Sequence, residues 1–179
     1  MAIEHTLLII KQHAVKHQQE IIEMVRDARL DILHIRTLRP SEHQCLEHYL
    51  MPDAWYEKIG ANVLARRQAA GLPIEKTARE YAEDVRRSSV KNLTPGPCVF
   101  IRVSGENAIA RLKALVGPTD PAKAPDETIR GRFRCDSFQK ADRRGGAVRN
   151  TVHCPDTPES AAREVDLWFN RFAEQPISL

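Results

Sequence analysis

The sequence predicts a mixed α/β domain of the α+β kind, in which strands alternate with helices along the chain. One observation is a dense apolar run at residues 6–10, Thr-Leu-Leu-Ile-Ile, which is typical of a central strand buried on both faces. A second is the recurrence of apolar residues near the end of the chain, at Ala161, Val165 and Trp168, which indicates an amphipathic helix. The length suits one domain with its own core, and we expect residues 1–179 to form it.

The remaining elements follow from apolar spacing and from the residues that start and stop helices. Each strand is followed by at least one helix, which gives the order strand, helix, strand, helices, strand, helix, strand, helix. The expected elements are a helix at 21–28, a strand at 31–39, a helix capped by Ser41, two helices around 55–70 and 74–85, a strand at 98–103, a helix opening at Gly105, a short strand ending at His153 and a helix from Pro158.

The composition is that of an ordinary globular protein. The net charge is only +3, so we expect neither nucleic acid nor an anionic membrane as the main partner. No apolar run approaches the roughly 20 residues that cross a membrane, and the first residues do not form a signal-peptide pattern. The four cysteines, Cys45, Cys98, Cys135 and Cys154, are scattered without a C-x-x-C pair, which is typical of reduced thiols. We therefore expect a cytoplasmic protein.

One stretch near the end of the chain combines residues that suit catalysis. A short apolar run leads to His153, and a helix begins soon afterwards, with Thr157 as its N-cap and Pro158 in its first turn. Glu164 falls on or beside the apolar stripe of that helix, where a carboxylate needs a partner. Pairing with His153 would fix the tautomer of the imidazole and leave its other nitrogen free as a nucleophile. The alternative is a loop histidine and a half-exposed helix acid.

This stretch resembles the active-site segment of nucleoside diphosphate kinases. The match consists of Arg149-Asn150, two further residues, His153 and then Glu159-Ser160-Ala161, with Glu164 in the position of the family's helix glutamate. The resemblance implies that His153 accepts the γ-phosphate of a nucleoside triphosphate such as ATP and passes it to a nucleoside diphosphate by a ping-pong mechanism. It also implies that Asn150 orients the nucleotide.

Other residues align with the family's phosphate-binding positions. Lys11 matches a lysine at the end of the first strand, Thr119 a phosphate-binding threonine, and Arg130, in a Thr-Ile-Arg-Gly run, a phosphate-clamping arginine. Lys113 stands where arginine is usual, which keeps the charge and loses the bidentate fork. Without the resemblance, Lys11 only marks where a strand reaches water, and Arg130 forms a surface ion pair.

Two aromatic residues complete the expected site. Tyr49 belongs to a His-Tyr pair that matches the family, whose tyrosine hydroxyl lies near the catalytic imidazole. Trp55 is the candidate for stacking on the nucleobase, and it is equally well explained as a core residue of an inserted helical hairpin. That hairpin, at about 51–92, and a polar loop at about 134–147 are both longer than in the common form of the family. We assign the polar loop no chemistry.

The resemblance implies a ferredoxin-like sandwich, a four-stranded antiparallel sheet with helices packed on one face. It also implies Mg²⁺ held mainly by the nucleotide phosphates, no protein metal site, and a homo-oligomer, either a hexamer or a tetramer. Cys154-Pro155 departs from the Gly-Ser that usually follows the histidine, which removes a hydroxyl and a backbone N–H. The alternative function is therefore a catalytically weak or inactive nucleotide-binding protein with a regulatory or assembly role; a nucleic-acid-binding module comes third.

Overall fold

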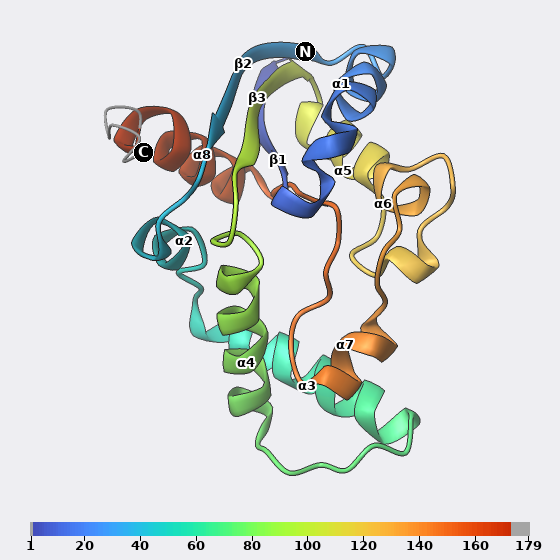
Figure 1. Ribbon diagram of the computed structural model, residues 1–179. Coiled ribbons are helices and arrows are strands. Elements are labelled where there is room, and N and C mark those ends of the chain that lie inside the picture. The colour runs from blue at the N-terminus through green and yellow to red at the C-terminus, as the bar shows by residue number, and fades with distance from the viewer. Residues whose placement is uncertain (1, 173–179) are drawn as a thin grey trace.

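The computed structural model describes residues 2–172, in which four strands form one antiparallel sheet with the order β2-β3-β1-β4 (Figure 1). The strands are β1 (Ile3–Ile10), β2 (Asp31–Leu38), β3 (Cys98–Glu106) and β4 (Val152–His153). β1 pairs with β3 along its whole length and with the short β4 at its end, where Ile9 lies opposite His153. This is the ferredoxin-like strand order, so the predicted fold class is confirmed.

Helices cover both faces of the central strand. Leu8 and Ile10 point into one core and Leu7 and Ile9 into another, which contains Trp168. Figure 1 shows α1 and α5 on one side of the sheet and α8 on the other. The first core is closed by η1 (Gln12–His17), α1 (Gln18–Asp27), α5 (Ala108–Val116) and α6 (Ile129–Arg132), and the second by α2 (Glu42–His48), α8 (Pro158–Asp166) and the π-helical turn η3 (Leu167–Arg171).

The expectation that helices lie on one face of the sheet is therefore wrong. Its physical reason is visible in residues 6–10, which are apolar or buried at every position rather than at alternate positions. A strand with two buried faces requires a layer of packing on each of them.

The segment expected to form a helical hairpin does so, away from the sheet (Figure 1). It consists of α3 (Asp53–Ala69) and α4 (Ala78–Lys91), which pack against each other. Thr77 caps α4 by accepting a hydrogen bond from the backbone N–H of Glu80, so α4 begins after Ile74, which is exposed.

The polar segment at 134–147 contains a helix that spacing did not predict. Helix α7 (Phe138–Arg144) begins at Ser137, whose hydroxyl accepts the Lys140 N–H, and ends at Gly145, which has a left-handed φ of +74°. Helix α7 packs against α3, so the two long segments contact each other (Figure 1). The short helix η2 (Pro121–Lys123) completes the described elements.

None of the helices in the described part of the chain is long and apolar enough to cross a membrane. All four cysteines are free thiols, as expected, and three of them are buried.

Candidate active site

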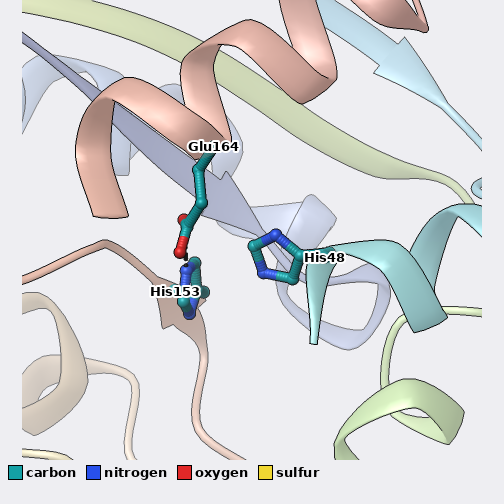
Figure 2. Close-up of side chains that lie close together, drawn as sticks. All are labelled: His48, His153 and Glu164. Atoms are coloured by element: carbon teal, nitrogen blue, oxygen red, sulfur yellow. Dashed lines mark hydrogen bonds and ion pairs between the residues drawn. The ribbon is translucent and has the colours of Figure 1, made fainter. Parts of the chain in front are cut away.

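The predicted pair of His153 and Glu164 is present in the structure. Nε2 of His153, at the end of β4, lies 2.7 Å from Oε2 of Glu164 on α8 (Figure 2). The Glu164 residue is 3% exposed, because it lies on the same helix face as the buried Ala161 and Val165. The His153 side chain is 20% exposed, so the ring remains accessible from one side. The alternative of a loop histidine and a half-exposed acid is therefore wrong.

The start of α8 follows the predicted local chemistry. The Thr157 hydroxyl accepts the Ser160 N–H, and Pro158 occupies the first helical turn. Burial alone would raise the pKa of Glu164, but the neighbouring imidazoles of His153 and His48, together with the hydrogen bond, hold it below its usual range. Glu164 is therefore an ionised carboxylate that accepts a hydrogen bond from the Nε2–H of His153. No described residue forms a hydrogen bond with Nδ1 of His153, which is the nitrogen left for a nucleophilic role.

Lys11, Asn150 and Thr119 come together beside this pair. Nζ of Lys11 donates to Oδ1 of Asn150 at 2.6 Å, and Nδ2 of Asn150 donates to the carbonyl oxygen of Thr119 at 3.2 Å. The Lys11 backbone N–H donates to the Thr151 carbonyl, two residues before His153. Burial lowers the pKa of Lys11 to about 7, and the nearby Arg130 contributes. An anion that enters the site would therefore stabilise the charged form of Lys11 and raise its pKa.

Arg130, on α6, forms hydrogen bonds with two backbone segments of the same region. Its guanidinium donates to the carbonyl oxygens of Gly117, at 2.8 Å, and Val152, at 3.0 Å. Gly117 has a φ of +82°, and an added Cβ would lie 2.6 Å from the Thr128 hydroxyl, so this turn requires glycine. Burial lowers the pKa of Arg130, and its Nε has no hydrogen-bond partner among the described residues. Arg130 is thus a buried cation rather than part of a surface ion pair.

Tyr49 lies near the histidine, as the resemblance implies. Its ring centre is 6.3 Å from that of His153, and burial raises the pKa of its hydroxyl. Sequence reasoning gave no role to the preceding His48, whose ring centre is 4.7 Å from that of His153 (Figure 2). The only signal was the His-Tyr dipeptide itself, because the contact joins α2 to β4, two elements far apart in the sequence.

Two expected site residues form no hydrogen bond or ion pair with this cluster within the described part of the chain. Lys113, whose side chain is 36% exposed, lies 3.8 Å from the carboxylate of Asp156. Trp55 is half-buried on α3, with its ring edge-on to Tyr56.

One group of described residues has the composition of a metal site. A nitrogen of His48, a nitrogen of His153 and a carboxylate oxygen of Glu164 lie within 4.8 Å of one another. However, Nε1 of Trp168 donates to Nδ1 of His48 at 3.1 Å, so the proton of this imidazole is on Nε2 and that atom offers no lone pair to an ion. Mg²⁺ prefers oxygen ligands, and the carboxylate of Glu164 is already engaged by His153. These residues therefore do not fit a resident metal ion.

A histidine with one nitrogen fixed by a buried carboxylate, beside a buried lysine and a buried arginine on a ferredoxin-like sheet, is an arrangement typical of proteins with a nucleophilic histidine. The family model described as "Nucleoside diphosphate kinase" matches residues 51–173. A nucleoside diphosphate kinase from Pyrobaculum aerophilum is 35% identical over 176 residues, covering 94% of this chain and 96% of the relative. The chain belongs to the nucleoside diphosphate kinase family.

Three further comparisons agree with this assignment. A nucleoside diphosphate kinase from Archaeoglobus fulgidus is 35% identical over 133 residues, 66% of this chain. The crystal structure of the Pyrobaculum aerophilum NDP kinase superposes with a TM-score of 0.89 at 34% identity, over 94% of this chain and 97% of that one. The nucleoside diphosphate kinase of Borrelia burgdorferi, at 24% identity and a TM-score of 0.74, shares the fold.

Proposed function

We propose that this chain transfers the γ-phosphate of a nucleoside triphosphate, ATP among them, to a nucleoside diphosphate through a phosphohistidine on His153. The observation that carries the proposal is the 2.7 Å contact between Nε2 of His153 and Glu164. This hydrogen bond keeps the proton of His153 on Nε2. The lone pair of Nδ1 is then available to attack phosphorus. As the P–Nδ1 bond forms, the bond from phosphorus to the β–γ bridging oxygen breaks and the diphosphate leaves. The terminal oxygen of a second diphosphate then attacks the phosphohistidine and restores the free ring.

Glu164 would stabilise the ring during both steps. The imidazole gains positive charge when Nδ1 bonds to phosphorus, and a buried carboxylate on Nε2 is placed to balance it. Tyr49, whose ring lies beside His153, would direct its hydroxyl to the transferred group. The deeply buried phenol stays protonated and so acts as a donor.

The cations and amides next to His153 would hold the polyphosphate. We assign Lys11 and Arg130 to the phosphate oxygens and Asn150 to orienting the nucleotide, because their polar groups converge on the segment before His153. The exposed Thr119 would donate its hydroxyl to a phosphate. Lys113 would have to leave Asp156 to reach the nucleotide, and we assign Trp55 to the base.

Mg²⁺ would be bound by the nucleotide rather than by a cage of protein carboxylates. The donor set beside His153 is made of cations and an amide, which suits phosphate oxygens and leaves the ion to them. When bound, the ion neutralises charge on the polyphosphate. We also propose a single domain over residues 1–179, a homo-oligomer and, given four free thiols, a cytoplasmic location.

Initial-rate kinetics test the proposed function. With ATP and GDP both varied, reciprocal plots should be parallel, as a covalent ping-pong mechanism requires, and His153→Ala should show no turnover. A folded protein that is stabilised by nucleotides yet transfers no phosphate to any nucleoside diphosphate would contradict the proposal. That result would instead support the nucleotide-binding alternative, which the buried Pro155 after the histidine motivates.

A further inference from the structure

His48 occupies the last turn of α2 and is completely buried. Nε1 of Trp168 donates a hydrogen bond to Nδ1 of His48 at 3.1 Å. Since the indole nitrogen can only donate, Nδ1 must be the acceptor, and the neutral ring carries its proton on Nε2. Trp168 therefore selects one tautomer of His48. Burial lowers the pKa of His48 to about 3, so the ring is neutral at ordinary pH.

The remaining donor of this ring has no hydrogen-bond partner among residues 2–172. Nε2 of His48 is among the few buried side-chain atoms that form no hydrogen bond within the described residues. A buried donor left unpaired costs about 1–3 kcal/mol, and such groups in native structures call for an explanation in another state of the protein.

The unpaired donor lies next to the reactive pair. The His48 and His153 rings meet edge-on, with centres 4.7 Å apart and planes at 81° (Figure 2). The carboxylate of Glu164 lies in the same group of atoms, all within 4.8 Å of one another. Glu164 is the acceptor in that group: its Oε2 accepts from His153, and its Oε1 lies 3.6 Å from a guanidinium nitrogen of Arg163.

The end of α2 that carries His48 is fixed from two other helices. Arg86 on α4 donates to the carbonyl oxygen of Tyr49 at 2.7 Å. Arg163 on α8 donates to the carbonyl oxygens of Glu47, at 3.3 Å, and His48, at 3.1 Å. These bonds satisfy carbonyls that a helix C-terminus leaves open, and they join α2 to the helix that carries Glu164. The His48 ring is therefore placed rigidly against the pair.

We propose that His48 is a positioning residue for phosphoryl transfer: with its proton fixed on Nε2 by Trp168, it holds the ring of His153 edge-on and gives Glu164 a second donor while His153 reacts. This role rests on the proposed function. A second hydrogen bond keeps the carboxylate ionised and in place, so that the Nε2 proton stays on His153 as positive charge develops on that ring. A neutral donor does this without adding a further cation beside a carboxylate that already has Arg163 3.6 Å from its Oε1.

Three variants separate this role from packing. His48→Phe keeps a planar ring and removes both the acceptor and the donor. His48→Gln supplies an amide oxygen for Trp168 and an amide N–H for Glu164, so it should restore function. Val90→Ala, in the same apolar cluster but outside the site, is the matched control for lost packing. The measurements are the rate constant for phosphorylation of His153 by saturating ATP, the KM for ATP, and the ¹⁵N spectrum of the imidazoles.

We expect His48→Phe to slow phosphorylation by about 10- to 100-fold, the range for losing a hydrogen bond to a charged group, with KM changed less than about twofold. His48→Gln should recover most of the rate, Val90→Ala should only lower the melting temperature, and the ¹⁵N spectrum should show His48 protonated on Nε2. A wild-type rate in His48→Phe, equal losses in the Phe and Gln variants, or a proton on Nδ1 would overturn the role of His48. A wild type that takes up no phosphate overturns the proposed function itself.

Discussion

Glu164 and His153 are eleven positions apart in the sequence, and their side chains meet at 2.7 Å because β4 ends where α8 begins its return over the sheet. This contact involves Nε2, so it determines which nitrogen of the histidine is available. The selection depends on a carboxylate that is buried on an apolar helix face, with Oε2 on His153 and Oε1 3.6 Å from a guanidinium nitrogen of Arg163.

Replacing Glu164 tests how much of the rate depends on its charge. Glu164→Gln keeps an acceptor for Nε2 and removes the charge, whereas Glu164→Ala removes both. We expect phosphorylation of His153 to slow by about 10-fold in the Gln variant and about 100-fold in the Ala variant, measured by rapid quench with ATP. Glu159→Gln, an exposed acid in the first turn of the same helix, is the control and should not change the rate. Equal rates in all three variants would remove Glu164 from the mechanism.

Nucleotide binding should take up a proton at Lys11. In the free protein burial lowers the pKa of this lysine to about 7, and bound phosphate, being negative, raises it. At pH 8 the lysine is therefore mostly neutral before binding and charged afterwards, whereas at pH 6 it is charged in both states. Calorimetry in two buffers of different ionisation enthalpy should show uptake of about one proton per site at pH 8 and almost none at pH 6.

The matched variants for this titration are Lys11→Met and Lys16→Met, the second an exposed lysine nearby. Uptake at pH 8 should vanish in the first and persist in the second. Binding heats that do not depend on the buffer in the wild type would contradict the assignment of Lys11 to the phosphate.

The two long segments should stabilise each other through Asp142. This buried carboxylate on α7 accepts two hydrogen bonds from Arg66 on α3, at 2.8 and 3.0 Å. Asp142→Ala should lower the free energy of unfolding by about 1–3 kcal/mol, because it leaves a partly buried arginine unpaired. It should also speed hydrogen exchange in α7. Arg79→Ala, which removes an exposed ion pair with Asp53, should change stability little. An unchanged exchange rate in α7 would mean that α7 does not depend on α3.

Trp55 can be assigned by separating binding from stability. If it stacks on the base, Trp55→Ala should raise the KM for nucleotides by roughly 5- to 100-fold, since stacking contributes about 1–3 kcal/mol per base. Trp55→Phe should recover most of the affinity. A fall in melting temperature with an unchanged KM would instead place Trp55 in the core of the hairpin.

The features that can be predicted from the sequence are those determined by residues close to one another along the chain. The buried strand, the Thr157 cap and the burial of Glu164 all follow from spacing within a single element, and each is present. The pairing of His153 with Glu164 was predicted with the help of the family resemblance, because the residues alone fit a loop histidine and a half-exposed helix acid equally well or better.

The features that sequence reasoning missed depend on contacts between distant segments. Trp168 and His48 are 120 residues apart, and nothing local marks either as the partner of the other. Helix α7 is polar and short, so apolar spacing does not reveal it. The ion pair of Asp142 with Arg66 attaches it to α3, in the other long segment of the chain. The second helical layer on the sheet likewise depends on the chain returning after His153.

The most direct test of the account is the intact mass of the protein after brief incubation with ATP and Mg²⁺, compared with His153→Ala. We predict one acid-labile, base-stable phosphate on the wild type and none on the variant. This phosphate should be lost when a second nucleoside diphosphate is added. Phosphate on both proteins, or on neither while ATP still binds, would contradict the claim that His153 is the nucleophile.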